Sequence, residues 1–444
     1  MVKKGEIMKK FFFVFIFLSF FAFSQIGNKK FSLNFYFNSE WGVHLNNPSK
    51  LMKGYNSVDI KGDYDFNDNI SLFFNLKKFY DSVYDIAGEY KNGSYKTATN
   101  TGNTWLREVF VDFDYSPLFV RLGRQQVVWG TADGVRVLDC INPGDSRYAY
   151  LDDASEYRIP LWMARIEYSP IEDGNLQLLL IPDYEPNYSS SYGDVFVYRV
   201  VNRPPAPFPI YENRPNDTFS HGSYAARWHY VINGWEYSLN YKYGYEFYPS
   251  VSVTPPPTIT IIKEYQKVKL IGASFSKSIN EGLLKGLTVR GEFLYTKDKP
   301  FPVGSDGKAS GNTTMNTFAY ILGLDKYFFT DMLTSFQFIQ FIYPDDKKSG
   351  QSVLFPATLS PLDKVETMAT LKVSKDFMSE RLKPEILIVY DGKGDWRFSP
   401  KVKFEVNDNL WVYAGIHYFT GKGNTLYGEF ESSSMIYAGA TLSF

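Results

Sequence analysis

The chain lacks the residues and segments that mark several common classes of protein. Its 444 residues include a single cysteine, Cys140, and only four histidines. One cysteine excludes an internal disulfide framework. After the N-terminal region, no segment approaches the run of about 18 apolar residues that marks a transmembrane helix. The formal net charge of -1 gives no indication of a nucleic-acid partner.

Aromatic residues, in contrast, are abundant. They make up 18% of the chain, with 38 Phe and 34 Tyr. The mean hydropathy of -0.26 is nevertheless that of a water-soluble protein. Many aromatic residues without long apolar runs are typical of strands whose side chains alternate between lipid and water.

Residues 1–24 have the pattern of a secretory signal peptide. Lys9 and Lys10 form a basic region, and the run from 11 to 23 is apolar except for one serine. Small residues suited to signal peptidase follow it. The run is too short to span a bilayer comfortably, although a retained anchor is the alternative. We expect secretion through the inner membrane and one mature domain over 25–444.

The last ten residues, 435–444, alternate strictly between two faces. Ile436, Leu442 and Phe444 share one face, so the period is two and indicates a strand with one apolar side. The order Gly439, Leu442, Phe444 resembles the signal of outer-membrane barrels. It implies recognition by the barrel-assembly machinery through Phe444. An ordinary edge strand gives the same alternation, so the rest of the chain must decide.

Four short turns test the alternation, because strands that pair across a turn must match their faces. With strands paired across them, outward apolar residues meet each other, and on the inner face acids meet bases. The outward pairs are Phe66 with Ile70, Tyr64 with Leu72, Tyr115 with Leu118, Ile232 with Trp235, and Val406 with Leu410. The inner pairs are Asp59 with Lys77 and Asp112 with Arg121.

Short and long connections alternate along the whole chain, with one exception at 391–395, which is short where a long loop is expected. The short ones lie near 67–69, 116–117, 169–174, 233–234, 279–285, 329–331, 377–382 and 407–409. The long ones lie near 46–54, 85–103, 131–159, 184–221, 248–264, 298–313, 344–362 and 421–431.

This rhythm predicts an all-β fold, a transmembrane antiparallel up-and-down β-barrel of eighteen strands. Sixteen is the second count, because the strands near 160–183 are weakly patterned. A propeller would show an internal repeat, which the sequence lacks. A sandwich would need about half as many strands.

Assigning apolar side chains to lipid places the polar ones in the lumen. Two adjacent strands are expected to place Arg397, Lys401 and Lys403 on one wall, which favours anions, although charge ladders without a selective role would look the same. Apart from Phe73, Phe110 and Met163, few apolar residues are assigned to the lumen, which argues against a path for hydrophobic substrates. The pore-lining and selectivity candidates are Asp112, Arg121, Gln125, Arg165, Arg227, Arg290, Arg397, Lys401 and Lys403.

The third long loop, 131–159, follows a stretch in which the alternation weakens. Its length, charge and Asn-Pro-Gly-Asp turn suit a loop folded into the lumen, but a surface loop is polar as well. The constriction-loop candidates are Arg136, Asp139, Asn142, Asp145 and Arg147. Of these, Asp139, Asn142 and Asp145 are weak Ca²⁺ candidates without EF-hand spacing. We expect no other metal and no cofactor.

Two arginines near this loop fall on opposite phases of the same strand. Arg121 is expected to face the lumen, and Arg124 needs a bulge at Gly123 in order to turn inward.

The same stretch carries a resemblance to a known family. Arg-x-Gly-Arg-Gln at 121–125, Trp129-Gly130, and Asp139 followed by Asn142-Pro143 and Asp145 look like a porin-like family of proteobacterial outer-membrane proteins of unassigned role. The architecture of that family is similar to the alginate-export barrel. The resemblance implies passive passage or export of an anionic or extended solute, and it carries over no catalytic residues.

We therefore expect an outer-membrane porin of a Gram-negative cell, in contact with membrane lipid and lipopolysaccharide, that passes small hydrophilic, anionic solutes. Catalysis is not expected. His229 opposite Ser238 is the one Ser–His coincidence, and it lacks a nucleophile motif. The alternatives are a barrel that transports hydrophobic substrates and a structural or adhesive barrel that acts through its outer loops.

Overall fold

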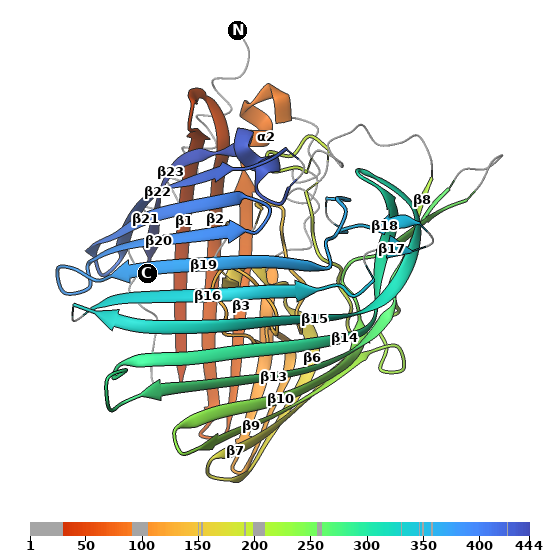
Figure 1. Ribbon diagram of the computed structural model, residues 1–444. Helices are drawn as coiled ribbons and strands as arrows, with labels where there is room; N and C mark the ends of the chain where they lie inside the picture. Colours follow the sequence, from red (N-terminus) through yellow and green to blue (C-terminus); the bar gives the residue numbers. More distant parts are fainter. Residues whose placement is uncertain are drawn as a thin grey trace.

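Figure 1 shows the computed structural model of the protein, a barrel with its loops gathered at one end. The signal peptide expected over 1–24 lies outside the described residues. These are 30–90, 105–149, 151, 154–190, 192–198, 209–254, 260–329, 331–345, 347–348, 350–356, 358–423 and 425–444.

The wall of the barrel is a closed antiparallel sheet of 18 strands, which confirms the predicted fold class and strand count. The strands are β1 (Phe31–His44), β2 (Asn47–Asn67), β3 (Ile70–Asp81), β4 (Leu106–Tyr115), β5 (Leu118–Gln125), β6 (Leu161–Ile171), β7 (Gly174–Ile181), β9 (Ser223–Ile232), β10 (Trp235–Tyr245), β13 (Lys267–Ile279), β14 (Leu287–Ser305), β15 (Lys308–Phe328), β16 (Met332–Ile342), β19 (Val365–Lys375), β20 (Leu382–Asp391), β21 (Asp395–Asn407), β22 (Leu410–Thr420) and β23 (Met435–Ser443).

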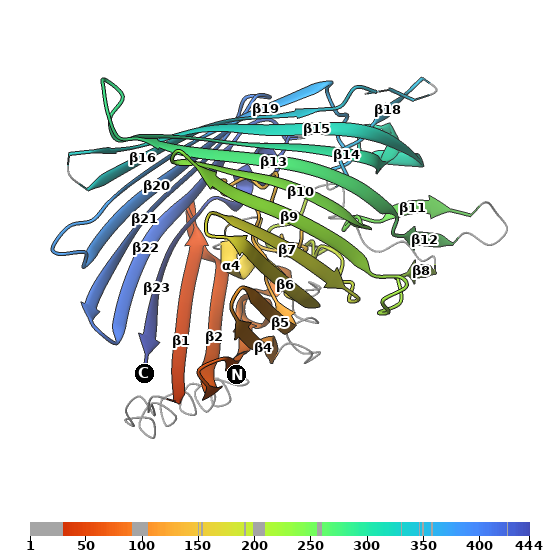
Figure 2. The same ribbon diagram turned by 90° about the horizontal axis from the view of Figure 1, so that it is seen from below.

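Each strand pairs with its neighbour along the chain, and β23 pairs with β1 to close the ring, as Figure 2 shows. The amides and carbonyls of Phe35 and Phe444 exchange two hydrogen bonds of 2.9 Å at this seam. Closure leaves no free edge in the wall, which is what a sheet surrounded by lipid requires.

Small elements lie in the connections between wall strands. They are the strands β8 (Ile210–Asn213), β11 (Ser250–Val253), β12 (Ile261–Glu264), β17 (Lys347–Lys348) and β18 (Gln351–Val353), and the short helices α2 (Val83–Ile86), η1 (Gly88–Tyr90), α4 (Ala154–Tyr157) and η2 (Gly428–Ser433). Among the described residues, none of the helices has the length and apolar character needed to cross a membrane.

The predicted hairpin registers are confirmed except beside two turns of the same sequence. Tyr64 pairs with Leu72, Tyr115 with Leu118 and Ile232 with Trp235, as expected. At both Asn-Asp-Asn turns, however, the first Asn takes the expected partner, Ile70 or Leu410, so that Phe66 and Val406 are skipped. The reason is local, because Asn67 and Asn407 accept a hydrogen bond from the amide two residues on.

Two of the expected long loops are strands instead. The β1–β2 hairpin continues through 46–54, and β14 and β15 continue through 298–313 as far as Ser305 and Lys308. The sequence was misleading because strand ends that rise out of the membrane into water carry polar residues, as loops do. Ladder hydrogen bonds satisfy the backbone there equally well.

The inner face of the wall is more apolar than predicted. One row of paired inward residues crosses four strands, with Glu292 beside Ile321, then Ile339 and Met368. Ile321 and Ile339 are almost completely buried. The expectation of few apolar lumen residues is therefore wrong. It failed because a strand with apolar side chains on both faces shows no alternation in its sequence.

Candidate functional site

The segment from 126 to 160, between β5 and β6, folds into the barrel. One face of it is apolar and packs on the inner side of β6, β7 and β9. The buried residues of this contact are Val127, Trp129, Leu138, Ile141, Leu161, Met163, Leu179, Ile181 and Ala225. Trp129 Nε1 also donates a 2.8 Å hydrogen bond to Gln177 of β7. The part of the lumen beside these strands is thus filled by side chains.

The same segment reaches across to β14. Glu292, which is 1% exposed, accepts hydrogen bonds from the Thr131 and Leu138 amides and from the Thr131 hydroxyl. Lys242 of β10 donates a 2.7 Å bond to the Cys140 carbonyl. Backbone groups of the loop that would otherwise lack partners inside the barrel are satisfied by wall side chains.

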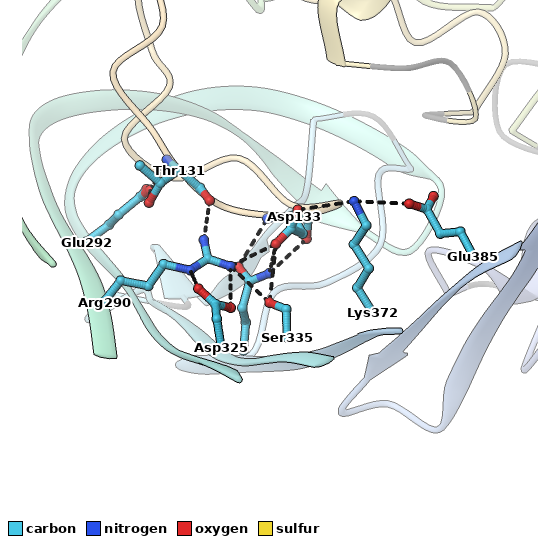
Figure 3. Close-up of polar contacts among 9 residues, drawn as sticks. Thr131, Asp133, Arg290, Glu292, Asp325, Ser335, Lys372 and Glu385 are labelled. Carbon is cyan, nitrogen blue, oxygen red and sulfur yellow. Dashed lines mark hydrogen bonds and ion pairs between the residues drawn. The ribbon is translucent and has the colours of Figure 1, made fainter. Parts of the chain in front are cut away.

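At its tip the loop presents one carboxylate, that of Asp133, to three wall strands (Figure 3). We call Asp133, Arg290, Ser335, Gln337 and Lys372 the Asp133 cluster. The Asp133 carboxylate lies 2.8 Å from Arg290 Nη2 and 3.7 Å from Lys372 Nζ, and it accepts a 3.2 Å bond from Gln337. Its amide donates to Gln337 in return, at 3.2 Å. The tip is therefore held by charge and by hydrogen bonds in both directions.

Two more carboxylates pair with the cations of the Asp133 cluster. Asp325 of β15 lies 2.8 Å from Arg290 Nε, and Glu385 of β20 lies 3.3 Å from Lys372. Arg290 also donates to the Thr131 carbonyl. Arg290 is only 9% exposed, and a buried guanidinium requires such partners.

Beside the loop lies a cavity of about 610 Å³, bounded on the other side by the wall from β13 to β23. Loop residues Asp133, Arg136 and Asp139 contribute to its lining, as do Arg397 and Lys401 of β21. On the side of β1–β3, the loops gather an aromatic cluster that includes Tyr148, Phe196, Tyr198, Tyr427 and Phe430. The cavity therefore lies in the lumen between the loop and the wall from β13 to β23.

Five of the nine predicted pore-lining residues either line the cavity or form ion pairs on the wall. Arg397 and Lys401 line the cavity. Arg121 forms a two-bond ion pair with Asp112, both bonds 2.7 Å, and Arg165 pairs with Glu167.

The remaining pore-lining candidates face other surroundings. Gln125 is fully buried and donates to the Met163 carbonyl, so its assignment to a pore surface is wrong. Arg290 belongs to the Asp133 cluster, and Arg227 faces inward on β9 beside Gln177. Lys403 lies over the Trp411 ring at 4.1 Å. All three candidates of the C-terminal wall, including Lys403, lie on the single strand β21 and not on two strands as expected.

The constriction-loop candidates serve separate contacts. Asp139 pairs with Arg136 at 3.0 Å and with Arg158 at 2.7 Å. Asn142 caps backbone groups, accepting from Val127 and donating to Ile159. Asp145 pairs with Arg147. The three weak Ca²⁺ candidates thus do not converge, and within the described ranges no group of three or more His, Cys, Asp or Glu is placed to hold a metal ion.

The bulge expected at Gly123 is absent, because β5 keeps an unbroken register with both neighbours. Arg124 therefore stays on the outer phase with Leu122, opposite Trp162, and its Nε donates to the Arg107 carbonyl at 3.1 Å. Gly123 instead adopts a φ of +145°.

Replacing Gly123 by alanine is expected to destabilise the barrel by about 2–4 kcal/mol. A Cβ at this position would lie 2.1 Å from the Val109 carbonyl oxygen and 2.6 Å from Phe110 Cα, both backbone atoms of β4. Urea unfolding in micelles, followed by tryptophan fluorescence, measures the change. Gly311→Ala on β15, where the nearest atom is 3.6 Å away, is the control and should change stability by under about 0.5 kcal/mol.

The loop contains its own reporter, the thiol of Cys140. Burial raises its pKa to about 11, so at pH 8 only about one thiol in a thousand is ionised, compared with roughly a quarter for a free cysteine. We expect maleimide labelling of the folded protein to be about a hundredfold slower than labelling of the urea-unfolded chain. Equal rates at pH 8 would contradict the raised pKa of this half-buried thiol.

Several solved bacterial structures resemble the chain over nearly its whole length. OccAB4 of Acinetobacter baumannii matches with a TM-score of 0.54 and 8% identity, covering 94% of this chain and 97% of that one. OccK3 (OpdO) of Pseudomonas aeruginosa matches with a TM-score of 0.53 and 9% identity, and the match covers 94% of each chain. OccK11 (OpdR) of the same organism matches with a TM-score of 0.52 and 9% identity, and the match covers 94% of this chain and 95% of that one. The likeness establishes a porin-like outer-membrane barrel fold.

No curated protein matches the chain in sequence. A family described as "Protein of unknown function (DUF1302)" matches residues 48–436.

Proposed function

Since the chain belongs to the DUF1302 family of proteins of unknown function, and since its fold is that of porin-like barrels, we propose that it is an outer-membrane channel for hydrophilic, anionic solutes. The observation that carries the proposal is the cavity between the third loop and the wall from β13 to β23. A solute crossing the barrel would pass between the loop tip and the lumen face of β21.

The charges around the cavity favour an anion. Two of its acids are matched by cations, Asp139 by two arginines and Glu385 by Lys372. Lys401 has no carboxylate within 4.0 Å among the residues that the structure describes; its ammonium lies 5.4 Å from the Tyr413 ring centre. An ammonium group not neutralised by a carboxylate, in a confined space, raises the local concentration of anions.

Planar-bilayer recording of the purified protein tests this function. We expect steady conductance with a preference for chloride over potassium, and Lys401→Gln should reduce that preference two- to fivefold. Arg121→Ala should leave the preference for chloride within about 20% of the wild-type value, because Arg121 lies away from the cavity lining. A cation-selective wild type, or loss of preference in Arg121→Ala alone, would contradict the proposal.

The location follows from the same reasoning. Large apolar side chains, among them Leu122, Tyr237 and Phe293, stand exposed on the outside of the wall, as contact with membrane lipid and lipopolysaccharide would require. Phe444, hydrogen-bonded to Phe35 at the seam, is the residue through which we infer recognition by the barrel-assembly machinery.

A second candidate function is transport of hydrophobic substrates. The buried apolar residues on the inner face of β13–β20, such as Val268, Ile321 and Val389, favour it. Bilayer recording would separate the two, because a barrel that carries only hydrophobic molecules need not conduct ions.

A further inference from the structure

We propose that the cavity binds an amphiphile, a molecule with a monoanionic head group and a short hydrocarbon body. The head would lie at Arg397 and Lys401, and the body along the apolar wall of the cavity. This inference deepens the proposed function and rests on it, since the amphiphile would occupy the same passage.

The head-group end is built on the neighbouring strands β21 and β22. Arg397 is 4% exposed and donates from Nε to Ser399 Oγ at 3.0 Å. Ser399 Oγ lies 3.1 Å from His417 Nδ1. Lys401 is the next inward residue along β21, and all four side chains line the cavity. Two cations, a hydroxyl and an imidazole therefore meet on one patch of wall.

Lys401 has no carboxylate within 4.0 Å among the described residues, and two other cations that line the cavity differ from it in this respect. Lys372 has Asp133 and Glu385, and Lys393 has Glu366 at 2.8 Å. These pairs satisfy their charges within the protein, so an incoming anion would have to displace a carboxylate to reach them. At Lys401 an incoming anion would displace only water, so its binding there is favourable.

Part of the cavity wall is apolar and offers little binding energy to a purely hydrophilic solute. It consists of Val268, Leu270 and Leu294 from β13 and β14, Phe341 and Met368 from β16 and β19, and Leu387 from β20. Sugars or inorganic ions that pass this part of the wall keep their hydration and gain no binding energy from it. A hydrocarbon chain gains about fourfold in affinity for each CH₂ group that it buries.

The volume of the cavity sets the size of the ligand. About 610 Å³ falls within the range of roughly 300–1,000 Å³ that is usual for small-molecule sites. This suits a carboxylate or a similar monoanion with a body of about eight carbons. Small-molecule sites usually have mostly apolar walls and a few placed polar groups that fix the orientation of the ligand.

Isothermal titration of the full-length protein in lipid nanodiscs tests the inference, with empty nanodiscs as the baseline. The probes are octanoate, acetate, which lacks the body, and 1-octanol, which lacks the charge. We expect octanoate to bind at least fiftyfold more tightly than either of the others. Lys401→Gln should weaken the binding of octanoate about tenfold, and Leu387→Ser should weaken it about fivefold. The matched control is Lys403→Gln, because Lys403 lies on the same strand but over the Trp411 ring. This variant should change the affinity for octanoate less than twofold.

Every outcome decides the question. Acetate binding as tightly as octanoate would overturn the apolar subsite, and octanol binding as tightly would overturn the charged one. Because both comparisons use the unaltered protein, they stand even if a variant fails to fold. Anion-selective conductance without octanoate binding would remove this inference and leave the channel intact. Octanoate binding without conductance would remove the channel instead.

Discussion

Asp133→Asn is expected to raise the single-channel conductance several-fold. The Asp133 carboxylate is the group through which the tip of the third loop meets Arg290, Lys372 and Gln337. Neutralising it removes two charge-assisted contacts, each typically the strongest kind of hydrogen bond or ion pair available at such a site. Arg290 keeps its ion pair with Asp325, and Lys372 keeps its ion pair with Glu385. The charges on the wall therefore stay balanced, while the loop tip loses its ion pairs with the wall.

The matched control is Asp325→Asn. It removes a carboxylate at the same 2.8 Å from the same arginine, but Asp325 belongs to β15 and not to the loop. We expect conductance within about 30% of wild type for this variant. Equal increases in both variants would mean that charge in the lumen, and not the position of the loop, limits the current. Faster labelling of Cys140 in Asp133→Asn alone would show that the loop has moved.

The second large effect is expected from Glu292→Ala. This buried carboxylate accepts hydrogen bonds from two loop amides and a hydroxyl. Leaving three donors without partners costs roughly 3–6 kcal/mol in total. We therefore expect the loop to detach and the Cys140 thiol to become at least tenfold more reactive at pH 8.

Glu292→Gln is the companion variant, because it keeps one acceptor oxygen in place. It should show an intermediate labelling rate. The heat-modifiability of both proteins on gels should remain that of a folded barrel, since the wall hydrogen bonds do not depend on Glu292. Unfolding of the whole barrel in Glu292→Ala would contradict the expectation that the loop and the wall are separable units.

The wall of the barrel could be predicted well from the sequence, for a specific physical reason. Where one face meets lipid and the other water, the period-two alternation fixes the register, and pairs such as Asp112 with Arg121 follow from it. The alternation fails where both faces are apolar, as around Ile321 and Ile339. It also fails to mark where a strand leaves the membrane, as at 298–313.

The candidate site could be predicted only in part. Arg397 and Lys401 were found because they are inward cations on a clearly alternating strand. Glu292 and Asp133 were missed, since their importance depends on which wall residue the loop meets. The residues in contact are far apart in the sequence, and no local pattern signals that contact. A charged residue in an inward position opposite a long loop is the one signal that could have pointed to Glu292.

The separation in sequence between the loop tip and its anchors has a consequence for biogenesis. Asp133 bonds to Arg290 and Gln337, 157 and 204 positions further along the chain. Contacts of such range form late, because the chain between them must be ordered first. The bore is thus narrowed only after β14 and β16 have joined the sheet, and a nascent barrel that stalls before that point would be leakier than the finished one.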